Sequence, residues 1–190
     1  MLHKMVVNWI VGLSISLRLS QRKTLAELVY GAMRCRRVSL ADIGRALETK
    51  TVVKHNIKRI WRFLKNNRLE VHEGVKGLIH LAAKAARGRL FVAVDWVDIG
   101  QYKVLRAAVP LRGRSVPILF AAYHKWELFK SQNNFEEGFL RLLKTLLPEE
   151  TDVVILADRG FGRAELAQTL QEIELSYVVR VCEVVWFSSD

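Results

Sequence analysis

The run LFVAVDWV, residues Leu90–Val97, decides the fold of the second half of this sequence. It is continuous, apolar and rich in β-branched and aromatic side chains, and it has the length of a buried strand. Asp95 interrupts it. A second run, DVVILAD (Asp152–Asp158), reads as another buried strand that ends in an acid. The two predicted strands therefore carry one aspartate each, Asp95 and Asp158.

Short connections join the first run to its neighbours. Turns at residues 99–101 and 111–114, each with a glycine, separate three predicted strands over residues 90–97, 102–109 and 115–123, which is typical of an antiparallel meander.

A helix follows the meander, with Asn134 as its cap, Glu136 and Glu137 in its first turn and Pro148 at its end. The pattern then predicts a strand over 152–157, a helix over 164–173 and a strand over 176–185. This order, βββαβαβ, is that of the ribonuclease-H-like fold, in which strands one and four are neighbours.

We therefore expect Asp95 and Asp158 to face each other across neighbouring strands. Two such carboxylates repel unless positive charge lies between them, and Mg²⁺ prefers hard oxygen ligands. Two Mg²⁺ ions about 3.5–4 Å apart would clamp the attacking and leaving oxygens of an in-line phosphodiester displacement. The alternatives are a polar strand end for Asp95 and a helix N-cap for Asp158. The predicted adjacency of the two acids favours metal ligation.

The charge is unevenly distributed. Residues 1–90 hold 19 Lys/Arg and 5 Asp/Glu, a net charge of +14, whereas residues 91–190 hold 11 and 14, a net charge of −3. This imbalance predicts a polyanion-binding module joined to a second domain, with nucleic acid as the leading partner and an anionic membrane surface as the second. We expect a helical DNA-binding domain over 1–88 and a ribonuclease-H-like domain over 89–190, an α/β chain overall.

The basic half reads as helices, and one pair of them resembles a helix-turn-helix. Ser39 and Asp42 form a capping-box signature for a short helix, and Thr51 is placed to cap the next one. On that second helix a basic stripe runs beside an apolar one. Its predicted DNA-binding residues are Lys54, Asn56, Lys58, Arg59, Arg62 and Lys65. The lysines and Arg62 suit phosphates, and Asn56 and Arg59 suit base edges. The alternative is a solvated face of an ordinary helical bundle.

The two aspartate motifs resemble those of a known family. VDWVD (Val94–Asp98) and LADRGFG (Leu156–Gly162) are similar to the first and second acidic motifs of the DDE transposases of bacterial insertion sequences, of the insertion-sequence-four type. The resemblance implies that Asp95 and Asp158 are the first two members of a metal-binding triad. It also implies hydrolytic nicking at element ends, followed by attack of the freed 3′ hydroxyl on target DNA. Arg159 would contact phosphate, or else form a salt bridge or pack in the loop.

The sequence departs from the family in two places. Val97 stands where the family often has threonine, and the third acid, a glutamate on a helix after the fifth strand, has no counterpart in this chain. The pattern indicates the N-terminal part of a longer transposase with an incomplete catalytic domain, inactive alone. Two alternatives stay open: a DNA-binding protein that acts as a repressor or competitor at element ends, and a nuclease or resolvase with a different third ligand.

The expected partners follow from these interpretations. They are double-stranded DNA and either a second copy of the chain or an intact transposase. Only two cysteines are present, so neither a disulfide framework nor a cysteine-based zinc site is expected. The apolar stretch from Met5 to Leu17 is too short to span a bilayer, which predicts a packed helix. We therefore expect a cytoplasmic protein without a membrane anchor.

Overall fold

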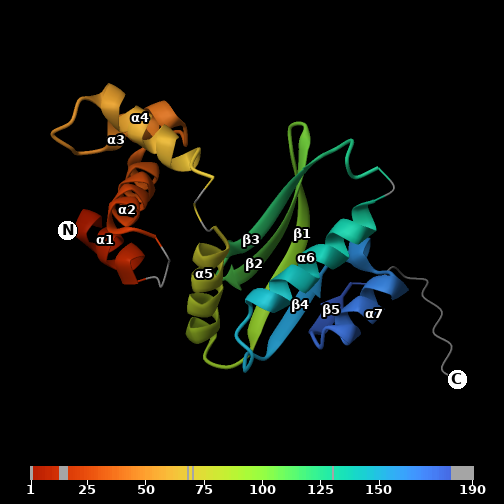
Figure 1. Cartoon of the computed structure of the whole chain (residues 1–190). Helices are drawn as coiled ribbons and strands as arrows, with labels where there is room; N and C mark the ends of the chain where they lie inside the picture. The colour runs from red at the N-terminus through yellow and green to blue at the C-terminus, as the bar shows by residue number, and fades with distance from the viewer. Residues whose placement is uncertain (1, 13–16, 68, 70, 130, 181–190) are drawn as a thin grey trace, which may run out of the picture. The chain divides into compact units, whose positions relative to one another are not determined.

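The computed structural model describes residues 2–12, 17–67, 69, 71–129 and 131–180. Within them the chain is an α/β protein with seven α-helices and a five-stranded mixed sheet (Figure 1). It divides into two compact units, Met1–Gly77 and Leu78–Asp190. The division falls inside helix α5 (Val71–Ala86), whereas the sequence predicts a boundary after residue 88.

The N-terminal unit is helical, as the sequence predicts. Helix α1 packs on α2, and α3 packs on both α2 and α4. Their bounds are Leu2–Gly12, Leu19–Arg34, Leu40–Ala46 and Val53–Leu64. The predicted packed helix near the start is confirmed for α1, while residues 13–16 of that stretch lie outside the described residues.

Two clusters of apolar side chains hold this unit together. Val6 and Ile10 of α1 are buried with Ala26 and Tyr30 of α2. The second cluster joins α3 to α4 and consists of Ile43, Leu47 and Ile60. Burial of such side chains is the main stabilising contribution to a small helical unit.

The two predicted caps have different outcomes. Ser39 caps α3, because its hydroxyl accepts a hydrogen bond from the Asp42 backbone N–H at 3.1 Å. The prediction that Thr51 caps α4 is wrong: the N-cap position is Val52, and no side chain bonds there. The buried Asn56 of α4 fixes the segment before the helix instead, because its side-chain amide donates a hydrogen bond to the Thr51 carbonyl.

The second unit is built on one sheet with the strand order β3-β2-β1-β4-β5. Strands β1, β2 and β3 form the predicted antiparallel meander, and β4 and β5 add to it in parallel. The strands span Leu90–Ile99, Tyr102–Leu111, Arg114–His124, Val153–Ala157 and Ser176–Val179. The predicted βββαβαβ order and the pairing of strand one with strand four are both confirmed. Residues 181–185 of the predicted last strand lie outside the described residues.

The two faces of this sheet differ in what covers them. Alternate residues of β1 (Leu90, Val92 and Val94) are buried on the face that carries helices α6 (Gln132–Leu146) and α7 (Ala164–Glu172) (Figure 1). Because side chains alternate along a strand, Phe91 and Asp95 point to the opposite face. Asp95 therefore lies on the more exposed side of the sheet.

Helix α6 begins earlier than the sequence predicts. Its N-cap is Ser131 and its first residue is Gln132, so the prediction that Asn134 is the cap is wrong. The earlier start puts Glu136 after the first turn, and the residue is 1% exposed on the side of the helix that carries the buried Phe139 and Leu143.

Candidate functional site

The two aspartates follow the last paired positions of two neighbouring strands, β1 and β4. The parallel register of β1 and β4 ends at Val94 opposite Ala157. Asp95 and Asp158 are the residues that follow this last pair. Asp158 still has an extended backbone, with φ −81° and ψ −179°. Since neighbouring strands are about 4.8 Å apart, the backbones at the two acids start side by side, and the facing of their carboxylates stays a prediction.

Asp95 has a cationic partner that the sequence analysis missed. Arg106 lies directly across from it on β2. Both guanidinium bonds go to one carboxylate oxygen: Nη2 donates at 2.7 Å and Nε at 3.2 Å to Oδ2. The side chains remain 36% and 47% exposed for Arg106 and Asp95. The pairing of Asp95 with Arg106 could have been predicted from the sequence, because a two-residue connection at Gly100 and Gln101 fixes the register of β1 and β2.

Asp158 begins a tight connection rather than the following α-helix. Its carboxylate accepts a hydrogen bond from the Gly160 N–H at 2.9 Å and caps a short 3₁₀ helix, η1 (Arg159–Phe161). The alternative that Asp158 caps the helix over 164–173 is therefore wrong, since the N-cap of α7 is Arg163. A Cβ at Gly160 would lie 3.1 Å from Asp158 Oδ1, so glycine permits the close approach. Arg159 is exposed beside Asp158.

The two carboxylates fit part of a magnesium site. Asp158 is exposed and the Asp95 side chain is about half exposed, so both carboxylates offer hard oxygens to solvent. Mg²⁺ commonly takes one or two carboxylates together with waters and substrate phosphate. Among the described residues, however, no group of three or more His, Cys, Asp or Glu side chains is placed to hold a metal ion. Asp95 and Asp158 thus supply a pair of ligands, and the two-ion site stays a prediction.

Asp98 takes no part in this pair. It lies three residues after Asp95, so the strand turns its side chain to the other face. There it forms an ion pair with Lys125 at 2.8 Å, and the hydrogen bond from that lysine lowers the pKa of the Asp98 carboxyl.

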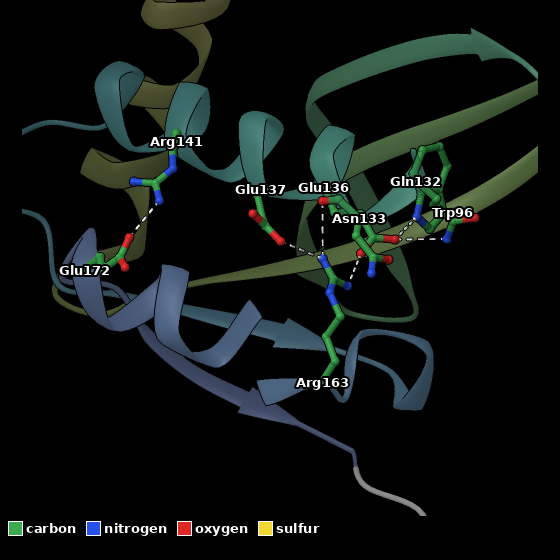
Figure 2. Close-up of polar contacts among 8 residues, drawn as sticks. All are labelled: Trp96, Gln132, Asn133, Glu136, Glu137, Arg141, Arg163 and Glu172. Atoms are coloured by element: carbon green, nitrogen blue, oxygen red, sulfur yellow. Dashed lines mark hydrogen bonds and ion pairs between the residues drawn. The ribbon is translucent and has the colours of Figure 1, made fainter. Parts of the chain in front are cut away.

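A buried polar network lies on the covered side of the sheet, opposite the two aspartates. Glu136 on α6 accepts a hydrogen bond from the Trp96 indole N–H at 2.6 Å and one from Gln132 at 2.9 Å (Figure 2). Its second oxygen forms an ion pair with Arg163. Arg163 also donates to the Asn133 carbonyl at 3.3 Å. Sequence reasoning missed this network because it assigned Glu136 to the first turn, where an acid is explained by the helix dipole.

The basic face on α4 is present in the N-terminal unit. Lys54, Lys58, Arg62 and Lys65 are all exposed. Their spacing of four, four and three residues places them along one side of the helix. We call these four residues the basic face. The Lys65 ammonium also lies 4.9 Å from the centre of the exposed Trp61 ring, a cation–π contact.

Two of the predicted base-reading residues are engaged inside the unit. Asn56 is 1% exposed, and its amide donates to the Thr49 hydroxyl at 2.9 Å. The prediction that Asn56 reaches base edges is corrected: it fastens the turn between α3 and α4. Arg59 forms an ion pair with Glu27 of α2 and is half-buried, so it joins two helices of the bundle.

Comparisons with known proteins add no relative. No protein-family model matches the chain, and no curated protein matches it significantly. Among the described residues, no helix combines the length and the apolar character needed to cross a membrane.

Proposed function

We propose that this chain is a DNA-binding protein of the DDE transposase type, with a ribonuclease-H-like second domain that carries part of a two-metal site. The observation that supports the proposal most strongly is the position of the two acids relative to the last pair of the β1–β4 ladder, Val94 and Ala157: Asp95 on β1 and Asp158 directly after β4 are each the next residue. Paired strands hold the residues just before both acids more rigidly than loops would, and a metal pair requires fixed spacing.

Asp95 and Asp158 would hold Mg²⁺ in this proposal. When bound, the metal lowers the pKa of water and stabilises charge on the leaving oxygen. In hydrolysis, a water oxygen bonds to phosphorus, the bond from phosphorus to the 3′ oxygen breaks, and that oxygen takes up a proton. In strand transfer, the freed 3′ hydroxyl replaces water as the nucleophile. Arg159, exposed beside Asp158, is placed to contact a phosphate.

The first unit supplies affinity for DNA. The exposed basic face neutralises phosphates and releases counterions, so duplex binding should weaken steeply with salt. Such contacts position a protein on DNA without reading sequence. With Asn56 buried and Arg59 paired to Glu27, sequence readout has to come from other residues.

A second candidate is a non-catalytic DNA-binding protein that competes with an intact transposase at element ends. Two observations favour it. Within the described residues, no third carboxylate gathers with Asp95 and Asp158. In addition, the Arg106 guanidinium already neutralises Asp95.

Strand cleavage separates the two candidates. Supercoiled plasmid would be incubated with Mg²⁺ and either the wild-type chain, Asp95→Asn or Asp158→Asn, and duplex binding would be measured on the same samples. Mg²⁺-dependent nicking that each substitution abolishes supports the transposase-type activity. Duplex binding without nicking in any sample supports the competitor, and the absence of duplex binding contradicts both.

A further inference from the structure

Glu136 contacts both chain segments that carry the candidate aspartates. Through Oε1 it accepts the Trp96 indole N–H, and Trp96 is the residue after Asp95. Through Oε2 it pairs with Arg163, which ends the connection that begins at Asp158. Figure 2 shows these contacts converging on α6 from β1 and from the start of α7. One carboxylate thus links the two segments from the far side of the sheet.

Glu136 links the two segments at the point where the hydrogen bonds of the sheet no longer fix the spacing between them. The ladder between β1 and β4 ends at Val94 and Ala157. After Ala157 the chain leaves the sheet through η1, so the position of Asp158 depends on what holds residues 158–163. Arg163 is 16% exposed and donates to Glu136, Glu137 and the Asn133 carbonyl, which fastens the far end of this connection to α6.

A residue that only filled space between α6 and the sheet would not need a buried ion pair. Burying a carboxylate costs free energy that its ion pair offsets only in good geometry, and apolar side chains of similar size often serve stability as well. A hydrogen-bonded charge pair does add direction and distance constraints that an apolar contact lacks. These constraints act on the two segments whose separation matters for a metal.

We infer that Glu136 is a positioning residue, which sets the spacing of Asp95 and Asp158 for a divalent cation. The inference rests on the proposed function, because it assigns Glu136 a task in the same site. Groups that orient metal ligands typically change metal affinity about 10- to 100-fold when they are altered.

The test uses Glu136→Gln in the full chain, with Glu172→Gln as the control for loss of an acid that pairs α6 with the α7 segment. Glu172 on α7 also pairs with a residue of α6, Arg141 at 2.7 Å, and Figure 2 shows this pair apart from Trp96 and Arg163. Mg²⁺ affinity would be measured by calorimetry, and exchange of the Gly160 amide by NMR without metal. Gly160 reports on the site directly, because its N–H is bonded to Asp158.

We expect Glu136→Gln to weaken Mg²⁺ binding at least tenfold and to speed exchange at Gly160, while Glu172→Gln changes neither. Equal effects of the two substitutions, or a loss of thermal stability with both readouts unchanged, would overturn the inference.

Two further outcomes keep the test decisive. If Glu136→Gln does not fold, Arg163→Lys takes its place, since lysine keeps the charge and loses the forked donors. If the wild-type chain binds no Mg²⁺, the proposed function fails. The exchange comparison then still decides whether Glu136 fixes the Asp158 connection: faster exchange with Glu136→Gln alone supports that linkage, and unchanged exchange overturns it.

Discussion

Asp95 has to serve two cations in this account. Its Oδ2 accepts both bonds from Arg106, and the same carboxylate is a proposed ligand of Mg²⁺. An exposed ion pair of this kind contributes about 0.2–1 kcal/mol. The guanidinium therefore competes with a metal without excluding it.

Removing the competing charge should strengthen metal binding. For Arg106→Gln we expect the Mg²⁺ dissociation constant to fall about 1.4- to 5-fold, the range that corresponds to about 0.2–1 kcal/mol. Calorimetry on the purified chain measures this. Arg141→Gln is the control, because Arg141 forms a similarly exposed pair with Glu172. Weaker Mg²⁺ binding in Arg106→Gln would show that Arg106 supports the site instead of competing for it.

Asn56 gives a second residue-scale prediction. For Asn56→Ala we expect the free energy of unfolding to fall by about 1–3 kcal/mol, because a buried hydrogen-bonded amide is lost from the turn before α4. Duplex affinity, measured at a temperature where the variant stays folded, should be unchanged. The exposed Asn67 supplies the control variant Asn67→Ala. A large loss of duplex affinity with stability intact would restore the base-reading role.

At the scale of elements, α3 and α4 approach each other closely at a glycine. A Cβ on Gly44 would lie 2.4 Å from Ile57 Cγ1 and 3.2 Å from the Ile57 Cα. The flexible end of the isoleucine can move, but the backbone of α4 has less freedom. This contact sets the spacing of the helix that carries the basic face.

Two helical glycines should therefore respond in opposite directions to alanine. Gly44→Ala should lower the free energy of unfolding by about 1–3 kcal/mol, because it overpacks the contact between α3 and α4. Gly138→Ala in α6 should raise it by about 0.5–1 kcal/mol, because a Cβ there meets open space and alanine favours the helix. Denaturant unfolding of both variants provides the measurement. A stabilised Gly44→Ala would contradict the close packing.

The basic face predicts a change in salt dependence. Lys54→Gln/Lys58→Gln removes two exposed charges from α4, and each phosphate contact contributes about 0.9 to the slope of log K against log salt concentration. We expect that slope to fall by about 1.8, as measured by duplex titrations at several salt concentrations. Lys76→Gln/Lys84→Gln on α5 removes the same charge and should leave the slope unchanged. Equal effects of the two double variants would mean that net charge alone drives binding.

At the scale of the whole molecule, hydrophobic pattern and turn chemistry predict most of the second unit. The run at Leu90–Val97 and the glycine turns determine the meander, and the two later runs determine which strands are added. The face to which the Asp95 side chain points then follows from the alternation of side chains along a strand, and the same alternation applies to the extended residue Asp158. These features depend on local sequence, which is why they are predictable.

Tertiary contacts account for what the sequence did not reveal. Glu136 and Arg163 are separated by 27 residues, and nothing local marks them as partners. Glu136 lies three and seven residues before the buried Phe139 and Leu143, so the helical period places it on the buried side of α6. The sequence pattern likewise assigns Asn56 to the polar stripe, whereas its hydrogen bond to Thr49 keeps it buried in the helical unit. Buried polar groups break the rule that polar residues face solvent, so patterns misplace them.

Magnesium binding by the wild-type chain and by the double variant Asp95→Asn/Asp158→Asn tests the central claim most directly. We expect a saturable calorimetric signal for the wild type and none for the variant, with both proteins folded and binding duplex DNA equally at fixed salt. Equal Mg²⁺ binding by the two proteins, or none by the wild type, would contradict the claim that these neighbouring aspartates form a metal site.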